Sequence, residues 1–239
     1  MKPITIVLSC EHAVNTVPQA YQSLFASQHG QEVLQTHRSI DFGALAIASH
    51  FKQVFDCDFI QAKASRLLID CNRSLVHPQC FSEMTAQLPE VEKQQLIQQY
   101  YFPFRQAVEK QIRHRIEEGY FVWHLSIHSF TPVFDTIIRN TDIGLLYDPR
   151  RISEKKLARD WQQQLKQQDS KLRVRLNYPY QGKSDGFTTA LRKQFDVNDY
   201  AGVEVETNQA LVSDEAVLSR LSATLTTSLK SLLESHKPF

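Results

Sequence analysis

Continuous apolar runs alternate with amphipathic stretches along most of the chain. The strongest runs cover residues 4–9 and 120–127, and each is followed directly by polar residues. An uninterrupted apolar run of this length is typical of a strand buried on both faces of a parallel sheet. Shorter runs predict further strands at residues 59–60, 67–69, 142–147, 172–176 and 200–206.

Between these predicted strands, apolar residues recur at the spacing of an amphipathic helix. Asp41 is a predicted N-cap, because apolar residues recur after it at helical spacing. Residues 89–119 form a long amphipathic stretch that Pro103 is expected to kink or split and Gly119 to end. Further helices are predicted at residues 153–168, 187–195 and 213–233. The order of elements predicts an α/β fold, a three-layer α/β/α sandwich around a mixed, largely parallel sheet.

Composition narrows the class of protein. The chain has 239 residues, of which 42% are hydrophobic, enough for a sizeable core. No repeat or linker divides it, so residues 1–239 are expected to form a single domain. Its 27 basic and 26 acidic residues leave a net charge of +1, so neither nucleic acid nor a membrane is an expected partner. The 4 cysteines lack C-x-x-C spacing and no long apolar segment occurs, so free thiols and a cytoplasmic location are expected.

Two histidines stand where strands are predicted to end. Glu11 and His12 follow the first apolar run, and His128 follows the run at 120–127. Carboxyl ends of parallel strands meet at one edge of a sheet, where ligands bind. Two imidazoles and a carboxylate make a catalytic zinc site with an open position for water. The alternative is that each histidine only bonds to the backbone, and two histidines at equivalent positions favour the metal.

Paired acids mark the last predicted strand. Glu204 and Glu206 are two positions apart, so on a strand their side chains share one face. One of them is then a candidate general base with a raised pKa. The alternative, a solvated edge strand with both acids outward, is equally compatible with the pattern.

Arginines flank the short run at residues 67–69. Arg66 precedes this run and Arg73 follows it. A guanidinium suits a substrate carboxylate, and a second one can stabilise a developing oxyanion, with Asp70 orienting one of them. Ordinary salt bridges are the alternative. No nucleophile elbow, P-loop or dinucleotide-binding glycine motif occurs, which argues against serine hydrolases and nucleotide binders.

Taken together, these segments resemble the N-formylglutamate amidohydrolase family. The resemblance rests on residues 9–18, 37–44, 65–73, 126–130 and 202–206 and so covers most of the chain. That family is similar in turn to the zinc carboxypeptidases and aspartoacylase, which share a three-layer α/β/α fold.

The resemblance implies roles for individual residues. It makes His12 and His128 zinc ligands and Glu204 the general base, with Arg66 beside the oxyanion. Asn72 and Arg73 match the pair that grips a substrate carboxylate. Asn15 stands where carboxypeptidases carry their glutamate ligand, so the third ligand is Asp41 or Glu11. Asp41 is favoured, because Glu11 needs an irregular backbone at the strand end to point the same way as His12.

The expected activity is zinc-dependent hydrolysis of a small N-acyl amino acid, most concretely N-formyl-L-glutamate to formate and glutamate. One alternative is a related zinc deacylase or carboxypeptidase-like enzyme with another substrate. The other is a ligand-binding relative that keeps the fold without turnover.

Overall fold

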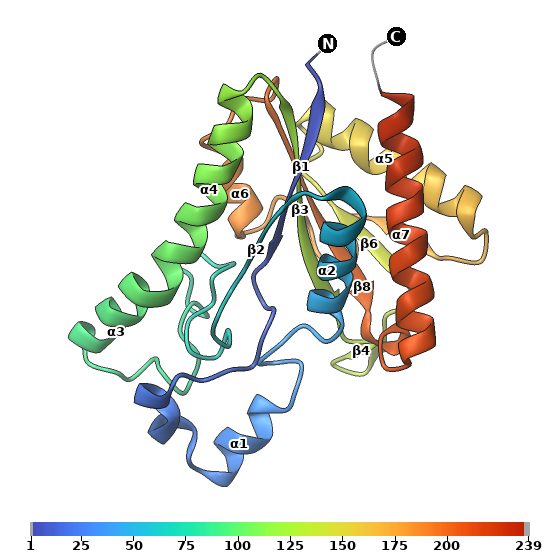
Figure 1. The fold of residues 1–239 in the computed structure, drawn as a ribbon. Helices are drawn as coiled ribbons and strands as arrows, with labels where there is room; N and C mark the ends of the chain where they lie inside the picture. The colour runs from blue at the N-terminus through green and yellow to red at the C-terminus, as the bar shows by residue number, and fades with distance from the viewer. Residues whose placement is uncertain (1, 237–239) are drawn as a thin grey trace.

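A six-stranded mixed sheet forms the centre of the computed structural model, which describes residues 2–236 (Figure 1). The strand order is β2 (Asp58–Gln61), β1 (Ile4–Cys10), β3 (Phe121–Phe130), β8 (Tyr200–Asn208), β6 (Ile143–Leu146) and β7 (Val174–Leu176). Strands β2, β1, β3 and β8 are parallel; β6 runs antiparallel to β8, and β7 is parallel to β6. The predicted mixed, largely parallel sheet is confirmed.

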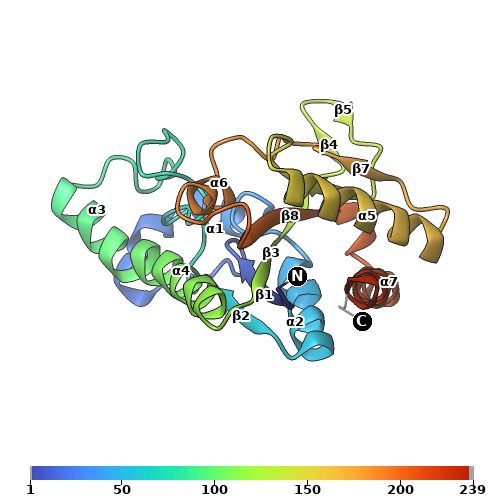
Figure 2. The ribbon, with the colours of Figure 1, turned by 90° about the horizontal axis from the view of Figure 1, so that it is seen from above.

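Helices cover both faces of this sheet. Helices α2 (Ala44–Phe55), α5 (Ile152–Gln168) and α7 (Glu215–Ser235) pack on one face, where their apolar side chains join the largest core cluster. Helices α4 (Phe102–Glu117) and α6 (Phe187–Arg192) cover the other face (Figures 1 and 2). The three-layer sandwich predicted from the sequence is therefore present.

Strand β3 shows how one run of residues serves both layers. Trp123, Leu125 and Ile127 point into the core under α2, α5 and α7. His124 and His128 alternate with them and so face the α4 and α6 side, and they are buried as well. Strand β3 is thus hydrophobic on the face under α2, α5 and α7, and its other face carries His124, Ser126 and His128.

Shorter elements and loops gather at the carboxyl edge of the parallel strands (Figure 1). They are the 3-10 helices η1 (Gln19–Phe25) and η3 (Gln209–Leu211), the α-helices α1 (Gln28–Leu34) and α3 (Glu90–Leu96), the π-helical turn η2 (Ile97–Tyr101) and the hairpin of β4 (Val133–Phe134) and β5 (Ile137–Ile138). A separate apolar cluster that includes Phe25, Leu68 and Leu96 holds several of them together. These segments form the walls around the carboxyl edge.

Three local predictions are wrong. Residues 67–69 form a turn and not a strand; they are apolar because they fill the separate cluster, and a short apolar run does not distinguish the two. Strand β3 continues to Phe130, so His128 lies within the strand and not after it. Gly43, with a φ of 79°, and not Asp41 precedes the first residue of α2, which leaves the Asp41 side chain free for the histidines.

The long amphipathic stretch is helical without a break from Glu90 to Glu117. Helix α3, the π-helical turn η2 and helix α4 follow one another directly, and η2 ends just before Pro103, so a π-helical turn replaces the expected split. Gly119 then takes a φ of 91° just beyond the helix. Within residues 2–236, no helix combines the length and apolar character needed to cross a bilayer.

Candidate metal centre and active site

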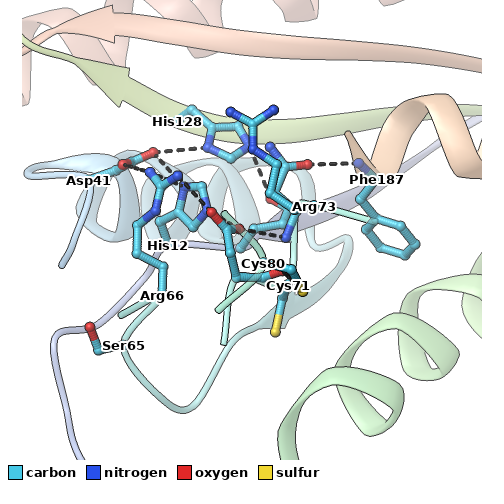
Figure 3. A network of polar contacts seen from close by, with 12 residues as sticks. His12, Asp41, Ser65, Arg66, Cys71, Arg73, Cys80, His128 and Phe187 are labelled. Carbon is cyan, nitrogen blue, oxygen red and sulfur yellow. Dashed lines mark hydrogen bonds and ion pairs between the residues drawn. The ribbon is translucent and has the colours of Figure 1, made fainter. Parts of the chain in front are cut away.

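Two histidines and one aspartate converge at the carboxyl edge of the sheet (Figure 3). His12 lies in the turn after β1, Asp41 in the loop before α2, and His128 on β3. The Oδ2 atom of Asp41 lies 3.2 Å from Nδ1 of His12 and 2.9 Å from Nδ1 of His128. One potential ligand atom from each residue falls within 4.8 Å of the others, and all three residues are buried.

Each histidine also has a carboxylate at its other ring nitrogen. Nε2 of His12 lies 2.8 Å from Oδ1 of Asp70, and Nε2 of His128 lies 3.3 Å from Oε2 of Glu11. Metal-binding histidines in proteins are commonly oriented in this way, with a carboxylate fixing the ring and its tautomer. The donor set and its surroundings therefore fit a divalent metal ion of the zinc type.

Glu11 lies behind His128 and outside the cluster of potential ligands. Its carboxylate accepts hydrogen bonds from the hydroxyls of Ser9 (2.6 Å) and Ser126 (2.8 Å). Burial by itself raises its pKa, but the hydrogen bond and charge of His128 and the bond from Ser9 lower it to about 2. Glu11 is thus held as a buried anion that contacts the back of one histidine.

Arg66 lies beside the cluster on the cavity side (Figure 3). Its Nη2 atom is 2.7 Å from Oδ2 of Asp70, and its Nη1 atom is 3.2 Å from Nδ1 of His12 and 3.6 Å from Oδ1 of Asp41. Although burial raises the pKa of Asp41, the adjacent histidines lower it below its ordinary value. The cluster therefore combines ionised carboxylates with the half-buried guanidinium of Arg66 at its edge.

Glu206 faces the same cavity from the neighbouring strand. This cavity has a volume of about 680 Å³, and His12, Asp41 and His128 are in its wall. Glu206 is in register with His128, and its Oε2 atom is buried with no hydrogen-bond partner within the described residues. Burial is the largest cause that raises its pKa to about 7. An unpartnered carboxyl at this position is suited to exchange a proton with a molecule in the cavity.

Glu204 lies one step back along the same face of β8. Its Oε1 atom accepts a hydrogen bond from the Thr188 hydroxyl at the start of α6. The two glutamates share one face of β8, as the sequence predicts, and both line the cavity rather than pointing to bulk solvent. They differ in position, because Glu206 and not Glu204 is level with His128.

Asn72 and Arg73 form the wall near Glu204. Oδ1 of Asn72 accepts from the backbone N–H of Phe187 (2.7 Å), and Nη1 of Arg73 donates to the carbonyl oxygen of Asp185 (2.8 Å). Both residues line the cavity, with the Nδ2 group of Asn72 not engaged in this contact. Within the segment from Asp70 to Arg73, Asp70 thus contacts the His12 ring, and Asn72 and Arg73 line the cavity.

Several side chains that support the cluster were not expected from the sequence. Ser9 and Ser126 hold Glu11, and Ser126 also lies 2.8 Å from Nε2 of His128. Period-two alternation on the two strands places them on the face of Glu11 and His128, so this signal was available. Thr188 and the cavity-lining Tyr180, whose hydroxyl accepts from Nη1 of Arg139 (3.1 Å), come from loops and a short helix whose placement no local pattern indicates.

Comparison with known proteins shows which family the chain belongs to. The family model described as N-formylglutamate amidohydrolase matches residues 4–213. The chain belongs to this family. No curated protein sequence matches it significantly.

Two solved structures resemble this family member over nearly its whole length. The Agrobacterium tumefaciens gene product Atu2144 is 30% identical, with a TM-score of 0.79 over 95% of this chain and 91% of that chain. The N-formylglutamate amidohydrolase from Ralstonia eutropha JMP134 is 17% identical, with a TM-score of 0.71 over 98% and 94% of the two chains. The second likeness shows a shared fold, and membership of the family makes the chain an amidohydrolase.

Proposed function

We propose that the protein is a zinc-dependent amidohydrolase that cleaves the amide bond of an N-formyl amino acid, with N-formyl-L-glutamate as the foremost candidate substrate. The observation that carries the proposal is the convergence of His12, Asp41 and His128 beside the unpartnered carboxyl of Glu206. Family membership supports the reaction class, and the cavity has room for a small acyl amino acid.

His12, Asp41 and His128 would hold the metal ion. A zinc ion at this position would polarise the amide carbonyl and lower the pKa of water. Asp41 is the better candidate for the third ligand, since its Oδ2 atom meets both imidazoles. Glu11 contacts the far side of His128 and would orient that ring.

Glu206 is the better placed of the two candidate bases. It is level with His128, and the charges of His128 and Asp41 both act on its carboxyl. Glu206 would accept a proton from the attacking water and return it to the leaving nitrogen. Arg66 would donate to the carbonyl oxygen as negative charge develops there.

Asn72 and Arg73 would bind the carboxylate of the substrate. The side chains of Arg73 and Asn72 line the same cavity as His12, Asp41 and His128. A carboxylate bound there would keep the neighbouring amide inside this cavity, whose wall also contains Glu206. This arrangement supports a small acidic amide as substrate, as opposed to an uncharged polymer.

Metal analysis and formate release test the proposal together. Purified protein loaded with zinc is expected to bind about one equivalent and to release formate from N-formyl-L-glutamate in a panel of N-formyl amino acids. A matched N-acetyl panel measures the preference for the acyl group. His128→Ala is expected to lose both metal and activity. Full activity in that variant, or no formate release by the zinc-loaded wild type from any N-formyl substrate, would contradict the proposal.

A further inference from the structure

Within residues 2–236, Glu204 forms no salt bridge, in contrast to three other acids that line the same cavity. Asp70 contacts Arg66, Glu83 contacts Arg38, and Asp41 lies between two histidines. Within residues 2–236, the polar partner of Glu204 is the neutral hydroxyl of Thr188. A carboxylate in this setting is stabilised by any cation that enters the cavity beside it.

The position of Glu204 relates it to the carboxylate-binding wall. Gly186 lies between the two: a Cβ atom at that position would be 3.4 Å from Oδ1 of Asn72 and 3.6 Å from Oε1 of Glu204. Arg73 donates to the carbonyl of the adjacent Asp185. The carboxyl group of Glu204 and the side chain of Asn72 therefore border the same small space. This space is open because Gly186 has no side chain.

An α-amino acid has the matching arrangement of charges. Its nitrogen and its carboxylate carbon are separated by only about 2.5 Å through the Cα atom. If Arg73 and Asn72 bind the carboxylate of an α-amino acid, its nitrogen lies close enough to reach the carboxyl group of Glu204. Residues two apart on a strand are separated by about 6.6 Å, so Glu204 and Glu206 can serve two different atoms of one substrate.

We infer that Glu204 binds the ammonium group of the leaving amino acid, a role distinct from that of the general base. This inference rests on the proposed function. In the reaction, the water oxygen bonds to the acyl carbon and the C–N bond breaks. The nitrogen, which carries one hydrogen in the amide, gains both protons of the water, one of them through Glu206, and leaves as ammonium while the acyl group leaves as carboxylate.

Binding of two matched ligands tests this role without turnover. L-glutamate and glutarate share a carbon chain and both carboxylates, but glutarate lacks the amino group. Calorimetry on the zinc-loaded wild type is expected to show L-glutamate binding at least about tenfold more tightly, the size of one charge-assisted hydrogen bond. Equal affinities, or binding of neither ligand, would overturn the inference.

Variants then locate the preference. Glu204→Gln is expected to reduce the glutamate-to-glutarate ratio below about threefold while glutarate affinity stays within about threefold of wild type. Thr188→Val removes the hydrogen bond to Glu204 but keeps the charge, so the ratio should persist. Glu83→Gln, which removes a charge paired with Arg38 in the same cavity, should also leave the ratio unchanged.

A purely structural role for Glu204 gives a different pattern. In that case Glu204→Gln and Thr188→Val would weaken both ligands alike, and the inference would fail. Glu204→Asp keeps the charge and should retain a preference for L-glutamate, which provides a second variant if the glutamine variant does not fold. Formate release by a wild type that shows no such preference refutes this inference alone, whereas the preference without any formate release refutes the proposed function alone.

Discussion

His128 and Glu206 occupy paired positions on the neighbouring parallel strands β3 and β8, and their side chains leave the sheet on the same face. Parallel strands in register bring residues at matched positions to within a few ångströms. A metal-ligand candidate and an unpartnered carboxyl are therefore fixed side by side by the sheet itself. Rigid strands position catalytic groups more accurately than loops do.

Exchange of each glutamate for glutamine should separate their roles. Glu206→Gln is expected to lower kcat by about 10²- to 10⁴-fold, the usual contribution of a general base, with metal content unchanged. Glu204→Gln should lower kcat about tenfold or less, because it contacts the leaving group and not the water. Steady-state kinetics with formate detection measures both. A greater loss in Glu204→Gln than in Glu206→Gln would reverse the assignment.

Glu11 should control metal affinity without being a ligand. Glu11→Gln keeps the shape of the side chain but removes the charge behind His128, and zinc affinity is expected to fall about 10- to 100-fold. Competition with a chromophoric chelator measures this affinity. Ser9→Ala removes one hydrogen bond to Glu11 and leaves its contact with His128, so its effect should be smaller. Complete loss of zinc in Glu11→Gln would instead mark Glu11 as a ligand.

His124 should make the metal-free protein less stable in mild acid. Burial is the largest cause that lowers the pKa of His124 from 6.5 to about 4. Between these two pH values the imidazole binds a proton in the unfolded chain but stays neutral in the folded state. The contribution of His124 to stability is therefore lost as pH falls from 6.5 toward 4, by about 2 kcal/mol at pH 5. The raised pKa of Glu206 acts in the opposite direction over this range, so the two proteins are compared with each other. In urea unfolding, wild type should lose about 2 kcal/mol more stability between pH 7 and pH 5 than His124→Gln. The same pH dependence in the two proteins would exclude His124 as the cause.

Gly186 and Gly144 should respond differently to alanine. At Gly186, whose φ of −171° suits any residue, a methyl group would meet Asn72 and Glu204 at ordinary contact distances but would fill the space between them. Gly186→Ala should raise KM about 5- to 100-fold with little change in Tm. At Gly144 the added methyl would collide with the carbonyl oxygen of Tyr178, so Gly144→Ala should lower Tm. Unchanged KM in Gly186→Ala would argue against a ligand in that space.

The central sheet was accessible from sequence because buried parallel strands are continuous apolar runs. Strands β1, β3 and β8 begin within a residue of their predicted starts. The run at 67–69 has the same composition but fills a local core as a turn, which periodicity does not reveal. Similarly, Asp41 has the sequence of an N-cap, yet Gly43 precedes the first residue of α2. The local sequence does not show that His12 and His128, which are distant along the chain, bind the Asp41 carboxylate.

Residue types and hydrophobic periodicity identify the fold class, the candidate histidines and acids, and a resemblance that the family match confirms. Each of these depends on hydrophobic period or on residue type, which are local properties. Tertiary structure alone decided which carboxylate joins His12 and His128, which one lies behind His128, and which glutamate is level with it. These contacts depend on strand register and on loops that meet at the edge of the sheet. Such long-range packing produces no periodic pattern in the sequence.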